Sequence, residues 1–143
     1  MQIHLDEELK KLNNHLLTMA TLTEQAIHNS IEALKARDKK KALRVIEDDR
    51  QIDELEINIE EQTIALLALF QPMAGDLRLI TTGMRITTEL ERIADLTVNI
   101  CQRVLDIADQ PFLKPLIDLP LLGDQAKMMV KMRSIPLSAV TNS

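Results

Sequence analysis

The chain has 143 residues, of which 45% are hydrophobic and 27% are charged, and its formal net charge is -5. This length fits one domain with a real hydrophobic core, so a large multidomain enzyme and a disordered chain are both excluded. The chain has no Trp or Tyr and only two Phe and three Gly. It therefore lacks the usual residues of strands and phosphate-binding loops, and an all-α fold without a nucleic-acid partner is expected.

Two long helices are predicted before the first helix-breaking residues. Residues 1–71 contain neither Gly nor Pro. Apolar residues between Leu5 and Leu34 recur at alternating spacings of four and three, which gives the first helix a broad apolar stripe. Asp38 is a favourable N-cap residue, and it predicts a tight turn near residues 37–39 and a second helix that continues to about Phe70. So short a connection makes the two helices antiparallel.

A third helix is expected to begin within residues 72–76, because Pro is tolerated in a first helical turn. It should end near Asp109, since Pro111, Pro115 and Pro120 follow. The predicted fold is an all-α, up-down-up bundle of three long antiparallel helices with a partial fourth helix. The predicted organisation is a three-helix repeat at 1–109, a Pro-rich linker at 110–120, the start of a second, truncated repeat at 121–133 with a short amphipathic helix at 121–132, and a disordered tail at 134–143.

Three features of the sequence indicate the cellular compartment: the single cysteine, the acidic N-terminal residues and the short apolar runs. Cys101 is the single cysteine, so it forms no internal disulfide and favours a reducing compartment. The first residues are acidic where a signal peptide needs a basic end. The longest apolar run, Ile64–Phe70, is far shorter than the ~20 residues that span a bilayer. We expect a cytoplasmic protein that is at most peripheral to a membrane.

Carboxylates form one stripe within an apolar surface of the predicted second helix: Asp49, Asp53, Glu56 and Glu60. Their spacing of four and three residues places them within roughly 60° of one another around the helix axis. The third helix repeats the pattern with Glu91 and Asp95, and Asn99 follows one turn later. Two acidic pairs are therefore expected to face each other across antiparallel helices.

A metal site is one interpretation of these acidic pairs. Unpaired buried carboxylates cost several kcal/mol, and oxygen ligands suit Mg, Ca, Mn and iron. The candidate ligands are Asp49, Asp53, Glu91 and Asp95, with Glu56 and Asn99 as possible additional ligands. The alternative is that the stripes remain solvated, because acidic helix faces are common.

Two further surfaces of the third helix are candidates for contacts between proteins. Arg78, Arg85 and Arg92 recur at heptad spacing away from the acids and form a candidate partner-binding surface, with simple solvation as the alternative. A second apolar face lies opposite the acids: Leu79, Ile86, Leu90, Ile93, Ile100 and Val104. We expect a three-helix bundle to leave part of this face exposed, so a homo-oligomer such as a dimer is predicted, with the fourth helix in the contact.

Three segments in order resemble the PhoU family of phosphate-uptake regulators: Asp49–Glu56, Gln71–Arg78 and Glu89–Ile100. The resemblance covers residues 5–105 well and residues 121–132 more loosely. It implies tandem three-helix repeats whose acid-x-x-x-Asp pairs bind metal ions or multinuclear clusters, with Fe, Mn, Mg or Zn as the candidate metals. It also implies a non-enzymatic, negative role in phosphate signalling beside a phosphate ABC transporter and its sensor histidine kinase.

The resemblance assigns roles residue by residue. Asp49 and Asp53 match the metal motif of the family's second helix, and Glu91 and Asp95 match that of its third. The chain departs from the family in having one repeat and only the opening of a second, and the resemblance ends at Arg133, which a truncation or a changed reading frame would explain. Two alternatives stay open: a metal-dependent phosphate-ester hydrolase, for which a nucleophile and a substrate loop are missing, and a purely structural helical module.

Overall fold

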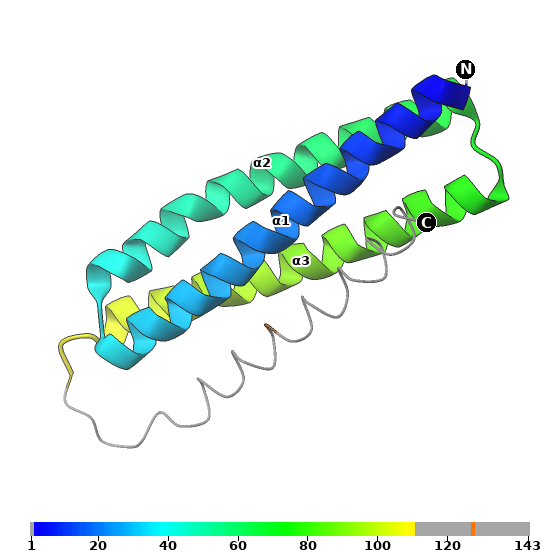
Figure 1. The fold of residues 1–143 in the computed structure, drawn as a ribbon. Helices are drawn as coiled ribbons and strands as arrows, with labels where there is room; N and C mark the ends of the chain where they lie inside the picture. Colours follow the sequence, from blue (N-terminus) through cyan, green and yellow to red (C-terminus); the bar gives the residue numbers. More distant parts are fainter. Residues whose placement is uncertain (1, 111–126, 128–143) are drawn as a thin grey trace.

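The structure, a computed structural model, describes the backbone of residues 2–110 and 127 and the side chains of residues 4–110 and 127. Three long helices run up, down and up: α1 at Gln2–Ala36, α2 at Lys39–Phe70 and α3 at Ala74–Ile107 (Figure 1). The predicted all-α three-helix bundle is confirmed. Most of the predicted fourth helix, most of the Pro-rich linker and the tail at 134–143 lie outside the described residues.

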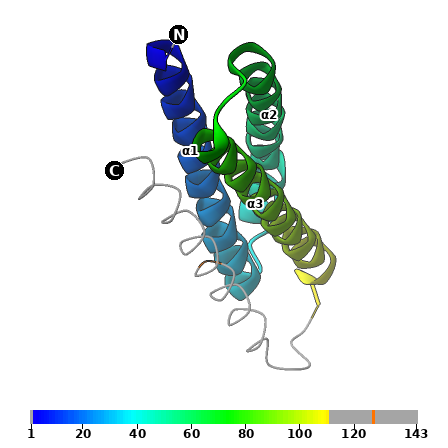
Figure 2. The same ribbon diagram turned by 90° about the vertical axis from the view of Figure 1, so that its right-hand side faces the viewer.

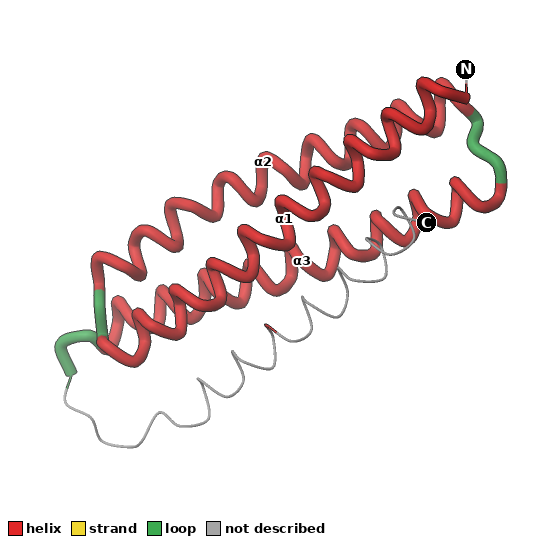
Figure 3. The backbone as a smooth tube through the Cα atoms, in the orientation of Figure 1, coloured by secondary structure: helices red, strands yellow, loops and turns green. Residues whose placement is uncertain are grey.

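The three helices all pack against one another. The tight turn between α1 and α2 and the end of α3 lie at one end of the bundle, and the connection from α2 to α3 lies at the other (Figure 3). Seen from the side, α3 crosses the other two helices obliquely (Figure 2). In the part of the chain that is described, no helix has a stretch long and apolar enough to cross a bilayer.

The two turns between helices use left-handed backbone conformations. Arg37 ends the first helix with φ 49°, and Gln71 ends the second with φ 44°. Asp38 is the N-cap of α2, as predicted, and its carboxylate accepts a hydrogen bond of 3.1 Å from the backbone N–H of Lys41. The third helix begins after Pro72 rather than with it, because Met73 holds the extended N-cap position.

The core is aliphatic and extends along the whole bundle. Its largest fully buried side chains come from all three helices: Met19, Ile27, Leu34, Ile59, Leu66, Ile80, Leu90 and Val104. Five hydroxyls are also buried, and each donates to a backbone carbonyl of its own helix, as Thr23 does to Met19 at 2.8 Å and Thr63 to Ile59 at 2.7 Å. These hydroxyls therefore need no partner on another helix.

The expected exposure of a second apolar face on α3 is wrong. Ile86, Leu90, Ile93 and Val104 are buried in the core, and Leu79 and Ile100 are half-buried, because this is the face that packs against α1 and α2. Among the exposed apolar side chains of α3, Leu77 and Met84 belong to the acidic side of the helix, and Leu96 lies in line with the row of Arg78, Arg85 and Arg92. The sequence pattern found both faces, but it did not decide which one the other helices cover.

Candidate metal centre

The acidic side chains of α2 and α3 lie on the seam where these two antiparallel helices meet. Asp49 is half-buried there. Burial raises the pKa of Asp49 from its ordinary value of 3.8 to about 6, and the negative charges of Asp53, Asp95 and Glu91 raise it further. The structure thus brings one acid of α2 within electrostatic reach of both predicted ligands on α3.

A second contact between the helices lies two turns further along α2. Burial raises the pKa of Glu56 from its ordinary value of 4.5 to about 7, and the next causes are the charge of Glu91 and a hydrogen bond with its side chain. Asp53 and Glu60 contribute further repulsion. A hydrogen bond between two carboxyl groups requires that one of them carries a proton, and the raised pKa of Glu56 favours the proton on Glu56.

Burial of these acids is less complete than the sequence pattern suggests. Asp49, Glu56 and Glu91 are half-buried, whereas Asp53 and Asp95 are exposed. The reason is that the acidic stripe of α2 follows the boundary between its core side, where Ile52 and Ile59 are buried, and an exposed side that carries Ile57 and Ile64. Asn99 is exposed one turn beyond Asp95.

The chemistry of the donor set fits a hard cation. All the candidate ligands offer oxygen atoms, which Mg, Mn and iron accept. Asp49 Oδ1 is buried and has no hydrogen-bond partner, which leaves a carboxylate oxygen on the seam without a donor. In the part of the chain that the structure describes, no cation pairs with these acids: its salt bridges join Lys11 to Glu8 and Lys39 to Asp109.

The side chains do not form a coordination sphere as they stand. Among the described residues, no group of three or more His, Cys, Asp or Glu side chains is arranged to hold a metal ion. Coordination would therefore require the exposed carboxylates of Asp53 and Asp95 to turn toward Asp49 and Glu91. The seam supplies converging negative charge rather than a finished site.

A cavity of about 220 Å³ continues the seam beyond these acids. Glu56 and Glu60 line it from α2, and Met84, Thr87 and Thr88 line it from α3. The threonines were not predicted as site residues. Their spacing relative to Glu91, three and four residues, places them on the same side of α3 and is the signal that would have found them.

The other candidate residues, a histidine, a cysteine and three arginines, lie outside the acidic seam. His15 of α1 contacts Gln62 of α2, with Nδ1 and Oε1 2.9 Å apart. Burial raises the pKa of the Cys101 thiol to about 11, so this group is a poor nucleophile at neutral pH. Arg78, Arg85 and Arg92 are all exposed on α3, away from the acids, as their spacing predicts.

Fold and site together define a class of protein: a bundle of three long helices with a carboxylate cluster on the seam between two of them. The family model described as the PhoU domain matches residues 16–104. The chain belongs to the PhoU family, which confirms the resemblance of the three segments on α2 and α3.

Comparisons with individual proteins agree with this assignment. The chain is 38% identical over 124 residues to the phosphate-specific transport system accessory protein PhoU homolog of Aquifex aeolicus, which covers 87% of the chain and 56% of that relative. It is 33% identical over 123 residues to PhoU of Escherichia coli, covering 86% and 51%. The crystal structure of PhoU from Pseudomonas aeruginosa superposes with a TM-score of 0.83 at 32% identity, covering 87% of the chain and 60% of that structure.

The chain spans about half the length of these curated relatives. They are named as accessory proteins of phosphate-specific transport rather than as enzymes. The family assignment agrees with the expectation that the chain is not an enzyme.

Proposed function

We propose that this chain is a cytoplasmic regulatory accessory protein of phosphate uptake that acts with a phosphate ABC transporter and its sensor histidine kinase. The match of residues 16–104 to the PhoU domain carries this proposal. A regulator of this kind contacts its partners through its surface. The long helices of the bundle offer such surfaces.

A genetic experiment tests the regulatory role. The chain is expressed in a bacterium that lacks its own PhoU, and a phosphate-starvation reporter is measured in phosphate-rich medium. Negative regulation predicts that the reporter falls toward its repressed level. A folded, expressed chain that leaves the reporter fully active would contradict the proposal, and a variant with an unfolded bundle serves as the baseline.

The second part of the proposal is that Asp49, Asp53, Glu91 and Asp95 hold divalent or trivalent metal, with Fe, Mn, Mg and Zn as the candidates. The unpaired carboxylate oxygen of Asp49 and the mutual repulsion of the four acids support it. A bound cation would neutralise this repulsion and supply positive charge to the seam. Glu56 and Asn99 are the further oxygen donors within one or two turns.

Metal content measured beside a matched variant tests this part. The wild type is compared with Glu91→Ala/Asp95→Ala, and with Glu54→Ala/Glu61→Ala, which removes two exposed acids of α2 outside the seam. Saturating Mn should raise the Tm of the wild type and of the control by roughly 5–10 °C, because metal binds the folded state, and should leave the seam variant unchanged. Equal responses of all three proteins, or none in a wild type shown to start metal-free, would contradict the site.

Partner contacts are the third part of the proposal. Arg78, Arg85 and Arg92 form an exposed basic row on α3 that suits an acidic surface of the transporter or the kinase. Reversing all three charges to Glu should leave the Tm nearly unchanged and weaken binding to the purified partner. Binding with unchanged affinity would remove this surface from consideration. A homo-oligomer remains part of the proposal, and sedimentation at several concentrations measures it.

A further inference from the structure

Positive charge is concentrated at the end of the bundle where α1 meets α2. Residues 35–44 contain six Lys or Arg side chains and one acid, Asp38, which gives this segment a net charge of +5 in a chain whose net charge is -5. The remainder of the chain is therefore strongly acidic. Such a separation of charge creates a local field that attracts anions to this end.

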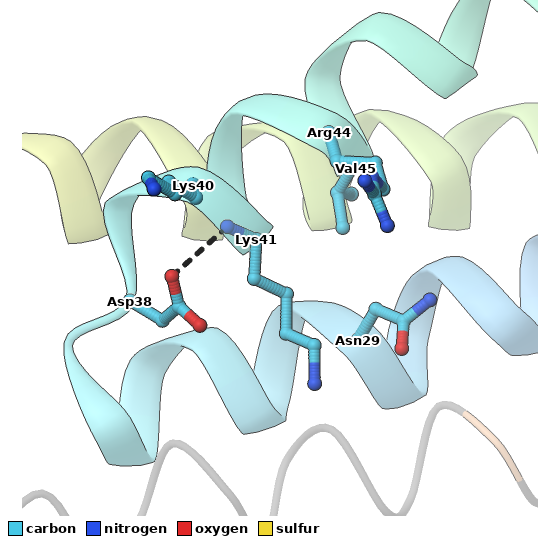
Figure 4. Close-up of a pocket in the computed structure, with 6 residues that line it drawn as sticks. All are labelled: Asn29, Asp38, Lys40, Lys41, Arg44 and Val45. Carbon is cyan, nitrogen blue, oxygen red and sulfur yellow. Dashed lines mark hydrogen bonds between the residues drawn. The ribbon is translucent and has the colours of Figure 1, made fainter.

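A cavity of about 260 Å³ opens at this basic end. Asn29 lines it from α1, and the other lining residues come from the turn and the start of α2: Asp38, Lys40, Lys41, Arg44 and Val45. Figure 4 shows the side chain of Lys41 extending from α2 toward α1, on which Asn29 lies. Arg44 lies on the same side of α2, and Lys40 points away. Asn29 and Lys41 are half-buried, whereas Asp38, Lys40 and Arg44 are exposed, so the cavity is open to solvent.

The described lining of this cavity carries three cations, those of Lys40, Lys41 and Arg44, and one carboxylate, that of Asp38. No salt bridge joins Lys40, Lys41 or Arg44 to a described acid. The neighbouring Lys39 differs, because its ammonium group pairs with Asp109. The carboxylate of Asp38 accepts a hydrogen bond from the backbone of Lys41 and caps α2. Lys39, Lys40 and Lys41 begin α2 without any acid in its first turn, the reverse of the usual charge preference.

We propose that this cavity binds a small phosphate-bearing anion, held by the ammonium group of Lys41, the guanidinium of Arg44 and the side-chain amide of Asn29. Arg and Lys form their strongest hydrogen bonds with ionised oxygens, and the planar guanidinium matches two phosphate oxygens. The cavity is smaller than the roughly 300–1,000 Å³ that enclose drug-sized ligands, which favours a phosphate group over a whole nucleotide. The anion comes either from free phosphate or from an anionic lipid headgroup. None of these three groups belongs to the carboxylates of the proposed function, although Asp49 borders a hollow that adjoins the cavity.

Inorganic phosphate at constant ionic strength is the first probe. The protein is stripped of metal and desalted beforehand, because Asp48 and Asp49 border a smaller hollow that adjoins the cavity, and a metal there would bind phosphate itself. NMR should show saturable shifts of the Asn29 side-chain amide and of residues 38–45, with a dissociation constant in roughly the millimolar range. The variant Lys41→Gln/Arg44→Gln should bind about tenfold more weakly or not at all.

A matched control separates a built site from general charge. Lys10→Gln/Lys11→Gln removes the same charge near the start of α1, at the other end of the bundle, and should leave phosphate binding within about twofold of the wild type. Asn29→Asp places a carboxylate in the cavity and should abolish binding while the circular dichroism spectrum stays helical. Equal weakening in the control and in the cavity variant would overturn the proposal.

Vesicles distinguish the two sources of the anion. Sedimentation with phosphatidylglycerol vesicles that depends on Lys41 and Arg44, together with weak binding of free phosphate, would assign the cavity to a lipid headgroup. Phosphate binding without vesicle binding would assign it to the free anion. The absence of both, in protein whose spectra show a folded bundle, would refute the site. None of these results depends on metal binding or on regulation, so each proposal fails separately.

Discussion

The acid Asp49 is expected to make the metal-free bundle less stable at neutral pH than at acidic pH. Its pKa is about 6 in the folded chain against an ordinary value of 3.8, so the folded state binds the proton more tightly than the unfolded state. The resulting stabilisation is fully present below pH 4 and is lost as the pH rises through 6. The substitution Asp49→Asn removes the charge permanently and should abolish this contribution.

The size of the effect follows from the shift in pKa. A shift of about two pKa units corresponds to a ceiling of about 3 kcal/mol. Asp49 is only half-buried, and screening by the water that reaches it reduces the expected value to about 1 kcal/mol. Asp49→Asn should therefore raise the free energy of unfolding at pH 8 by about 1 kcal/mol in metal-free protein and change it little at pH 4.

Chemical denaturation at pH 4 and pH 8 measures this difference directly. Glu54→Gln, which removes an exposed acid of the same helix outside the seam, is the control, and its effect should be smaller and nearly independent of pH. With saturating Mn at pH 8, the wild type should become more stable than Asp49→Asn if the proposed site exists, because the wild type gains metal binding that the substitution weakens. A variant that is less stable than the wild type at pH 8 without metal would refute the electrostatic account of the seam.

Two further predictions concern the backbone. Gly83→Leu should lower the free energy of unfolding by about 1–3 kcal/mol in denaturation experiments, because even a Cβ at Gly83 would lie 3.0 Å from Leu16 Cδ1, and Gly75→Leu, where nothing lies within 4 Å, should be close to neutral. A destabilised Gly75 variant and a stable Gly83 variant would contradict the close approach of α1 and α3. Gln71→Gly should raise the free energy of unfolding by about 0.5–1 kcal/mol, and with it the Tm, because a φ of 44° is unfavourable for a residue that has a Cβ. A lower Tm would show that the left-handed turn carries little strain.

Much of the fold was predictable because helix boundaries here depend on local chemistry. The absence of Gly and Pro before residue 72 allowed two long helices, and Asp38 marked the break between them. The burial of the second apolar face of α3 was not predictable, because two apolar stripes on one helix look alike in sequence. Their assignment depends on how α3 is rotated against α1 and α2, and this is decided by the packing of the whole bundle, including the close contact at Gly83.

The candidate site was predictable only as far as helical spacing allows. Spacing placed Asp49 and Asp53 on one stripe and Glu91 and Asp95 on another, and the structure brings the two stripes to one seam. The close contact between Glu56 and Glu91 depends on the axial alignment of α2 and α3, which the length of the connection between them sets. The basic cavity was missed for a similar reason: Lys41 and Arg44 are neighbours in sequence, but Asn29 joins them only through the packing of α1 on α2.

Repulsion within the carboxylate seam is expected to lower the free energy of unfolding of the metal-free bundle. A cation bound at the proposed site would remove this repulsion and thereby raise the free energy of unfolding. Replacing the acids by apolar residues would relieve the repulsion but would also remove any response to metal. With the acids in place, a metal ion bound at the proposed site would turn mutual repulsion into attraction, and the spacing of α2 and α3 would then depend on metal. Arg78, Arg85 and Arg92 lie on the same α3 helix that supplies Glu91 and Asp95. A change in the packing of α3 against α2 would therefore move the proposed partner surface together with the proposed metal ligands.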